Sequence, residues 1–181
     1  MIGGDLTCGP DRAKAPDVAF SLGGLTEPRL LVPRLLSDRP EAVIEELAQR
    51  LEAVGRIPKA TAFAEIVIRR ELDLPTFVGE GVVVPHGRGA AVKALTLAVG
   101  LSDSGLPWGR EGHLKAHCVF LSAIPPTGAS RFLVLLSALS GLIRDDAALS
   151  ALKAAARPED MLRVLSGVKL VRKVKRAPVA W

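Results

Sequence analysis

The sequence predicts an α/β fold: a single domain in which a small mixed β-sheet is flanked by helices on both faces. Three patterns indicate it. Amphipathic helical periodicity dominates before residue 72, short apolar runs occupy residues 81–124, and helical periodicity returns from residue 130. Hydrophobic residues make up 49% of the 181-residue chain, which is enough for a substantial core. Because the predicted strands are short and unevenly connected, a mixed sheet is favoured over a purely parallel one.

Two amphipathic helices are predicted before the sheet. The first covers residues 37–55, with Ser37 or Asp38 as the expected N-cap and Gly55 as the stop. Its apolar stripe consists of Val43, Ile44, Leu47, Leu51 and Val54. The second runs from residue 58 to 72 and ends in basic residues, which suit a helix C-terminus. The residues expected to face inward from it are Phe63, Ile66 and Val67.

The pattern then changes to that of strands. The run "GVVVPH", residues 81–86, is apolar and β-branched, which is typical of a strand buried on both faces. Residues 94–101 and 116–124 predict two more strands. The connection between those two is expected to contain Gly105, Pro107 and Gly109. Three further helices are predicted over residues 130–143, 145–156 and 158–167.

The organisation of the chain is expected to be simple. Residues 1–28 are rich in Gly, Pro and Asp and predict a flexible or loosely docked extension, followed by a domain over 29–167 and a basic tail over 168–181. No apolar run approaches the roughly 18 residues of a membrane span, and the start lacks the pattern of a signal peptide. The two cysteines, far apart in sequence, suggest no disulfide framework. A cytoplasmic protein is expected.

The charge does not indicate nucleic acid as the partner. The net charge is +5, but five Lys or Arg lie in the last fourteen residues, where no acid balances them. Aromatic residues are only 4% of the chain and tyrosine is absent, so the stacking surfaces of single-strand binders are missing. We interpret the basic end as a solvated tail, with an edge strand or weak attraction to anionic surfaces as alternatives.

One histidine, His86, follows the apolar run in the motif Pro-His-Gly. Near neutral pH an imidazole keeps an available lone pair, so it can act as nucleophile, base or metal ligand. An ordinary turn histidine is the alternative. A metal site with His113 and His117 is disfavoured, because no Cys or carboxylate cluster completes the ligand set. A Ser–His–Asp triad stays open, although no G-x-S-x-G elbow, Walker A loop or G-x-G-x-x-G motif occurs.

The segment "RELDLPTFVGEGVVVPHG", residues 70–87, resembles the signature of the fructose–mannitol class of enzyme IIA domains of the bacterial phosphoenolpyruvate-dependent phosphotransferase system, which includes the nitrogen-regulatory IIA proteins. The matching positions, without a gap, are Arg70, Glu71, Thr76, Gly79, Pro85, His86 and Gly87. The flanking helices and strands are similar as well, so the resemblance covers about residues 29–167.

The resemblance implies that His86 accepts a phosphoryl group from phosphorylated HPr or its nitrogen-branch analogue. The group then passes to a IIB partner or is retained as a regulatory mark. Arg70 would stabilise the phosphoryl group, since a guanidinium grips two oxygens at once. The supporting residues are Thr76 and Gly87 as further donors, Glu71 in a structural role, and Arg88 to attract phosphate or an acidic partner. No metal, organic cofactor, nucleic acid or membrane insertion is implied.

One position departs from the family pattern. Many members carry a second histidine at the start of the long helix, where this chain has Phe132 with Arg131 beside it. Either Arg131 supplies a replacement cation, or the site has drifted toward slow transfer or signalling. The leading hypothesis is a phosphocarrier of nitrogen-regulatory type. The alternatives are a sugar-permease IIA component with IIB and IIC on separate chains, and an interaction module that has lost phosphorylation.

Overall fold

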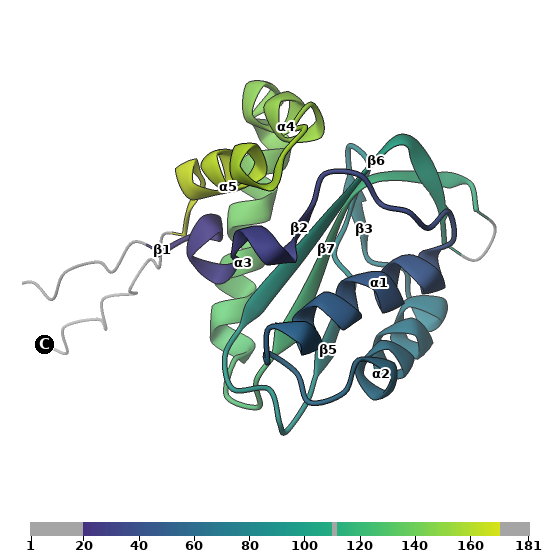
Figure 1. The fold of residues 1–181 in the computed structure, drawn as a ribbon. Helices are drawn as coiled ribbons and strands as arrows, with labels where there is room; N and C mark the ends of the chain where they lie inside the picture. The colour runs from purple at the N-terminus through teal and green to yellow at the C-terminus, as the bar shows by residue number, and fades with distance from the viewer. Residues whose placement is uncertain (1–19, 110–111, 171–181) are drawn as a thin grey trace, which may run out of the picture.

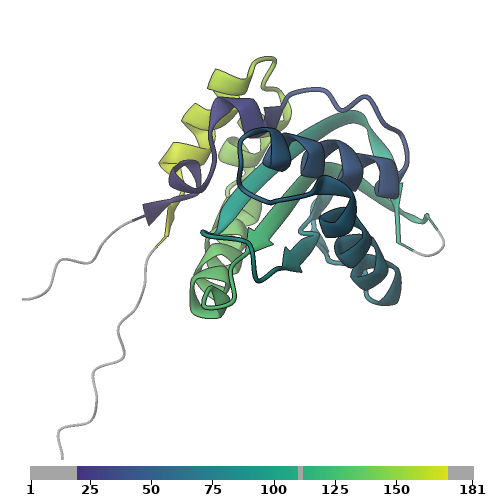
Figure 2. The same cartoon turned by 60° about the horizontal axis from the view of Figure 1, so that its bottom comes forward.

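The predicted three-layer α/β arrangement is confirmed in a computed structural model, which describes residues 20–109 and 112–170 (Figure 1). One face of the central sheet is covered by α1 (Pro40–Ala53) and α2 (Ala60–Asp73). The other face is covered by α3 (Ala129–Arg144), α4 (Asp146–Lys153) and α5 (Pro158–Gly167), as Figure 1 and Figure 2 show. Within the described residues, no helix is long and apolar enough to cross a bilayer.

The sheet is mixed, as predicted. Its order is β2-β6-β7-β4-β3, and β5 pairs with β7 beyond the end of β4. The strands are β2 (Leu31–Val32), β3 (Phe77–Gly79), β4 (Val82–Val83), β5 (His86–Arg88), β6 (Thr96–Trp108) and β7 (Leu114–Ile124). The pairs β3–β4 and β6–β7 are antiparallel, whereas β2–β6, β4–β7 and β5–β7 are parallel. The central strand β7 therefore pairs with both β4, which precedes His86, and β5, which begins with His86.

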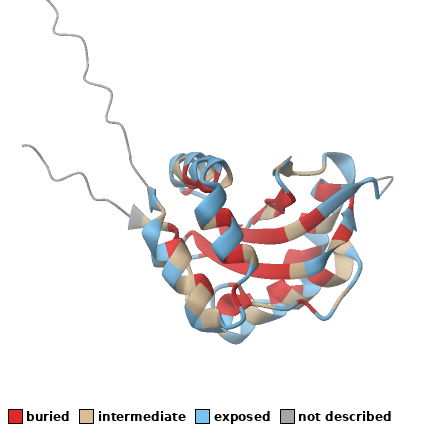
Figure 3. Cartoon of the chain, turned by 90° about the horizontal axis from the view of Figure 1, so that it is seen from above, coloured by how far each residue is buried: buried red, intermediate tan, exposed pale blue. Residues whose placement is uncertain are grey.

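Both faces of the sheet are apolar, because each packs against helices. Val82 lies in the core under α3–α5, while Val83 lies in the core under α1 and α2, and both side chains are fully buried. This confirms the prediction that "GVVVPH" is buried on both faces. Figure 3 shows buried residues along the central strands and many exposed residues along the helices.

The ends of the first two helices differ from the predictions. The N-cap of α1 is Arg39, without a side-chain hydrogen bond, so Ser37 and Asp38 are not caps; Pro40 at the first position removes one N–H that would need a partner. Gly55 follows α1 with φ +71°, the left-handed conformation expected of a stop. In α2 the amide of Ala60 donates to Glu52 Oε2 of α1 at 2.8 Å. Thus a neighbouring helix supplies the cap.

Two predicted details of packing and hairpin length are wrong. Ile66 is 51% exposed, whereas Phe63 and Val67 are buried as expected. Gly105 and Pro107 do not form a connection but lie within β6, which continues to Trp108. The β6–β7 register shifts between Leu101 and Leu106, and Gly105 has φ +74° there. An irregular stretch of the ladder therefore accommodates the glycine inside a longer hairpin.

The N-terminal segment is more ordered than predicted where the structure describes it. Leu22 is fully buried, and η1 (Leu22–Leu25) packs against α5. A two-stranded sheet pairs β1 (Phe20–Ser21) with β8 (Lys169–Leu170), and η2 (Pro28–Leu30) leads into β2. The expectation of a loosely docked segment therefore fails over residues 20–28. The remainder of the predicted extension, 1–19, and residues 171–181 of the predicted tail lie outside the described residues.

Candidate functional site

His86 begins β5, held by the central strand. It pairs with Ser122 of β7, and the amide of Ser122 donates to the carbonyl of Pro85 at 2.9 Å. The chain does not turn at Gly87 but stays paired with β7 through Arg88. The side chain of His86 is half-buried. Because a paired strand is more rigid than a loop, the backbone that carries the imidazole is fixed in position.

The two ring nitrogens of His86 have different partners. Nδ1 lies 3.0 Å from the carbonyl oxygen of Val84, which can only accept, so we assign the ring proton to Nδ1. Nε2 accepts a hydrogen bond of 2.9 Å from Nε of Arg70, at the C-terminal end of α2. The lone pair of the neutral ring is thus on Nε2 and faces a guanidinium.

The surroundings keep this ring neutral. Burial lowers the pKa of His86 below its ordinary value of 6.5, and the charges of Arg70 and Arg88 lower it further. The hydrogen bond to Val84, the second-largest cause after burial, and the charge of Glu71 raise the pKa and offset part of this lowering. The ring of Phe132, in the first turn of α3, lies 4.6 Å from the imidazole between centroids, tilted by 42°. Phe132 therefore contributes an apolar face rather than a second titratable group.

Glu71 is a buried carboxylate that makes its hydrogen bonds within the protein. It is 7% exposed and accepts from the amide of Thr76 at 2.6 Å and from Nε1 of Trp108 at 2.8 Å. The hydroxyl of Thr76 also points to this carboxylate, 2.9 Å from Oε2 and 3.0 Å from Oε1. The Thr76 hydroxyl proton is thereby engaged with the Glu71 carboxylate in this structure.

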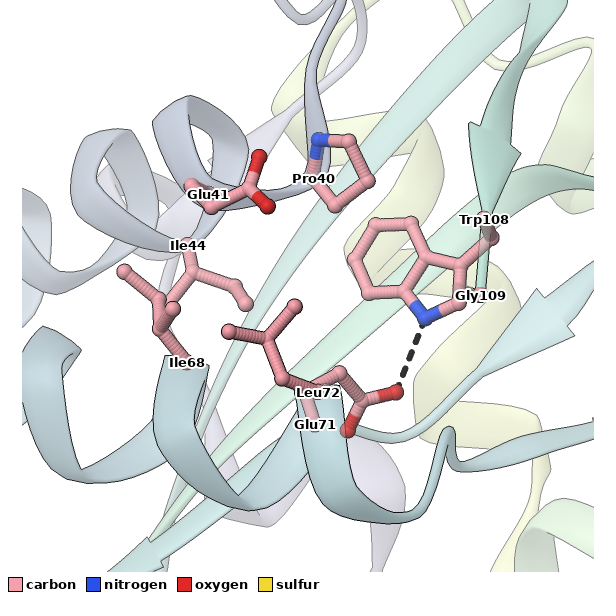
Figure 4. Close-up of a pocket in the computed structure, with 8 residues that line it drawn as sticks. All are labelled: Pro40, Glu41, Ile44, Ile68, Glu71, Leu72, Trp108 and Gly109. Atoms are coloured by element: carbon pink, nitrogen blue, oxygen red, sulfur yellow. Dashed lines mark hydrogen bonds between the residues drawn. The ribbon is translucent and has the colours of Figure 1, made fainter. Parts of the chain in front are cut away.

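A small cavity of about 30 Å³ adjoins the Glu71–Trp108 hydrogen bond (Figure 4). It lies between α1, α2 and the end of β6, and its lining residues are Pro40, Glu41, Ile44, Ile68, Glu71, Leu72, Trp108 and Gly109. In Figure 4 the indole edge and the Glu71 carboxylate face each other across its margin. The volume holds little more than one water molecule, so it is a packing defect beside the network rather than a ligand pocket.

The other predicted residues are placed as follows. Gly87 is buried, and a Cβ there would lie 2.8 Å from Phe63 of α2, so the glycine is needed for helix packing. Arg88 is exposed at the end of β5, and its charge acts on His86. Arg131 is exposed on α3, one residue before Phe132. The structure thus brings Arg70 and Phe132 into contact with the imidazole.

The remaining histidines take no part in this site. His113 lies in the β6–β7 connection, and the ring of His117 on β7 bonds to the carbonyl of Ser102 at 3.0 Å through Nδ1. Within the described ranges, no group of three or more His, Cys, Asp or Glu could hold a metal ion. Sequence reasoning missed Val84 and Trp108. The part of Val84 that matters is its backbone carbonyl, which every residue has, so no sequence pattern reveals it. A tryptophan in a long strand such as Trp108 is ordinarily interpreted as a core residue.

Comparison with known proteins shows the family of the chain. Residues 30–168 match the family model described as "Phosphoenolpyruvate-dependent sugar phosphotransferase system, EIIA 2". The chain belongs to this family. EIIA domains are components of a phosphotransferase system.

Two solved structures and one curated relative are similar. The relative is the 2-O-α-mannosyl-D-glycerate-specific EIIABC component of Escherichia coli, 40% identical over 127 residues, which are 69% of this chain and 19% of that protein. The nitrogen regulatory protein IIA-Ntr of Neisseria meningitidis has a TM-score of 0.71 at 23% identity, covering 80% of this chain and 98% of that one. Enzyme IIA of the mannitol system of E. coli, in complex with phosphorylated IIB, has a TM-score of 0.66 at 18% identity, covering 79% and 99%. The structures establish the fold. The chain spans about a fifth of the length of the relative.

Proposed function

We propose that this chain is a phosphohistidine carrier of the phosphoenolpyruvate-dependent phosphotransferase system, with His86 as the phosphoryl acceptor. The observation that carries the proposal is the state of the imidazole. Its Nδ1–H is bonded to Val84, its pKa is lowered, and its Nε2 lone pair meets Nε of Arg70 at 2.9 Å. A neutral, oriented ring beside a cation suits phosphoryl transfer, which depends on positioning and charge stabilisation.

The proposed step begins with a phosphohistidine on HPr or its nitrogen-branch analogue. Nε2 of His86 forms a bond to phosphorus as the donor's P–N bond breaks, and the electron pair of that bond returns to the donor nitrogen. The Nδ1 proton stays on the ring, where the Val84 carbonyl stabilises the positive charge that develops. Because Nε2 cannot accept from Arg70 and attack phosphorus at once, the guanidinium must turn from the lone pair to the phosphoryl oxygens.

The phosphoryl group has two possible fates, which are transfer to a IIB partner and retention as a regulatory mark. The sugar-permease role, in which a IIB partner receives the group, is favoured by the 40% identity to a sugar-specific EIIABC component. A fold shared with IIA of the mannitol system bound to phosphorylated IIB is compatible with it. The nitrogen-regulatory role is compatible with the fold shared with IIA-Ntr. The identity to this relative therefore favours transfer to a IIB partner, whereas the sequence by itself favoured the nitrogen-regulatory role. The proposed location of the chain is the cytoplasm.

The experiment is reconstitution with enzyme I, phosphoenolpyruvate and either HPr or its nitrogen-branch analogue, followed by intact-mass measurement and mapping of the label. We expect one phosphoryl group per chain, acid-labile and on His86. His86→Ala should abolish it, whereas the matched controls His113→Ala and His117→Ala should retain it. The absence of any label with both donors would leave the third hypothesis, an interaction module without phosphorylation. The two donors separate the branches by rate, and added IIB proteins test transfer to a IIB partner.

A further inference from the structure

A single chain of hydrogen bonds leads from a buried tryptophan to the imidazole. We propose that Trp108 is a positioning residue for His86, acting through Glu71, Thr76 and Val84. The inference rests on the proposed function, since it concerns how the acceptor ring is held. Trp108 lies at the far end of β6 and donates to Glu71, whereas the ring nitrogens of His86 are bonded to Arg70 and Val84. Its influence therefore passes through intermediate groups.

The first link fixes the carboxylate of Glu71. The Trp108 side chain is fully buried, and its Nε1–H donates to Glu71 Oε1 at 2.8 Å. A carboxylate that is 7% exposed needs donors to replace water, and an unsatisfied one is costly. Thr76 supplies the other donors through its amide and hydroxyl. Trp108 and Thr76 thus hold one carboxylate between them.

The second link carries this position to Nδ1 of the imidazole. The carbonyl of Thr76 accepts from the amide of Val84 at 3.0 Å, and the carbonyl of Val84 accepts from His86 Nδ1 at 3.0 Å. Val84 lies between β4 and β5, outside the regular ladder. Its peptide groups are consequently oriented by the Thr76 bond on one side and by the imidazole on the other.

The third link reaches Nε2 of the same ring. Glu71 directly follows Arg70 near the end of α2, and Arg70 donates to His86 Nε2 at 2.9 Å. A shift of the Glu71 carboxylate therefore disturbs both ring nitrogens: Nε2 through the neighbouring residue, and Nδ1 through Thr76. The adjoining cavity of about 30 Å³ leaves the carboxylate room to move when the indole donor is removed (Figure 4).

The test must separate positioning from simple core packing. Trp108→Phe keeps an aromatic side chain but removes the N–H donor, and Thr76→Val removes a second donor to the same carboxylate. Thr76→Ser, which keeps the hydroxyl, is the conservative variant. Ile57→Val is the matched control, because Ile57 is a buried member of the same core cluster without a place in the hydrogen-bond chain. Denaturation midpoints identify the variants that are comparable in stability.

The decisive readout is the ¹⁵N spectrum of His86 in the unphosphorylated protein. In the wild type, Nδ1 should resonate as a protonated nitrogen and Nε2 as an unprotonated one. In Trp108→Phe and Thr76→Val the two shifts should move toward each other, while Thr76→Ser and Ile57→Val should match the wild type. The rate of phosphorylation at saturating phospho-HPr should fall about tenfold in the first two, with half-saturation changed by less than about twofold.

The outcomes are distinguishable. Unchanged ¹⁵N shifts in both Trp108→Phe and Thr76→Val would overturn the inference, even if the rate falls, because the indole would then serve stability alone. An equal change in Ile57→Val would overturn it as well. If the wild type accepts no phosphoryl group at all, the proposed function fails, while the ¹⁵N shifts still decide whether Trp108 controls the ring.

Discussion

Replacing Gly87 with alanine should separate α2 from the strand that carries His86. A Cβ at this position would lie 2.8 Å from Phe63 Cε2 and 2.9 Å from Val67 Cγ2. Carbon atoms in ordinary contact are about 3.5–4.0 Å apart, so α2 or its side chains must retreat by up to about 1 Å. Both neighbours are buried, at 5% and 0% exposure, and have little room. Overpacking of this kind costs about 1–3 kcal/mol of unfolding free energy.

The same displacement should reach the site. Arg70 lies one turn after Val67 on α2, and its Nε is 2.9 Å from Nε2 of His86. If α2 retreated by roughly 1 Å, the distance between these two nitrogens would become too long for a hydrogen bond. We therefore expect Gly87→Ala to lower both the unfolding free energy and the rate of phosphoryl acceptance, measured by urea denaturation and by reconstituted transfer.

Gly141→Ala is the matched control. Gly141 lies within α3, and a Cβ there would meet nothing within 4 Å. Alanine should stabilise this helix by about 0.5–1 kcal/mol. In the double variant Gly87→Ala, Phe63→Leu, the smaller side chain should recover part of the loss, giving a coupling energy of about 0.5–3 kcal/mol. A Gly87→Ala protein as stable as the wild type would refute this reasoning about helix packing.

Three other predictions concern the imidazole. Because the pKa of folded His86 is lowered below 6.5, the ring stays neutral above that pH; the stability contributed by the neutral ring is present above pH 6.5 and is lost as pH falls through the lowered pKa. An NMR titration of the ring should give a midpoint below 6.5, and a midpoint above it would contradict the burial argument. Phe132→Ala should raise this midpoint, since water replaces an aromatic face 4.6 Å away; an unchanged midpoint would show that Phe132 does not desolvate the ring. Arg70→Lys keeps the charge but loses the Nε donor and the planar fork, so the transfer rate should fall about a hundredfold, and a wild-type rate would exclude a specific role for the guanidinium.

The layers of the fold were predictable because local patterns and global packing agree. The stripe of α1, the doubly buried Val82–Val83 pair and the apolar helix after residue 128 each have a periodicity that permits one interpretation. The errors fall where tertiary contacts override local signals. Glu52 from another helix caps α2, and an irregular stretch of β6 accommodates Gly105, which by itself indicates a turn.

The candidate site divides in the same way. A motif resemblance could find Arg70 and His86, since both are side chains in a recognisable pattern. The sequence could not show that Val84 O orients the ring, because every residue carries the same carbonyl. The contact of Trp108 with Glu71 spans 37 positions and depends on the length of β6, which the glycine and proline signals disguised. Long-range geometry of this kind becomes visible only in the folded chain.

The most direct test is to identify the atom that carries the phosphoryl group. The protein would be labelled with [¹⁵N]histidine, phosphorylated through enzyme I and HPr, and examined by ³¹P–¹⁵N NMR. Our account predicts one phosphorus bonded to Nε2 of His86, with Nδ1 still protonated by virtue of its bond to Val84. A phosphorus bonded to Nδ1 of His86, or to any other residue, would contradict it.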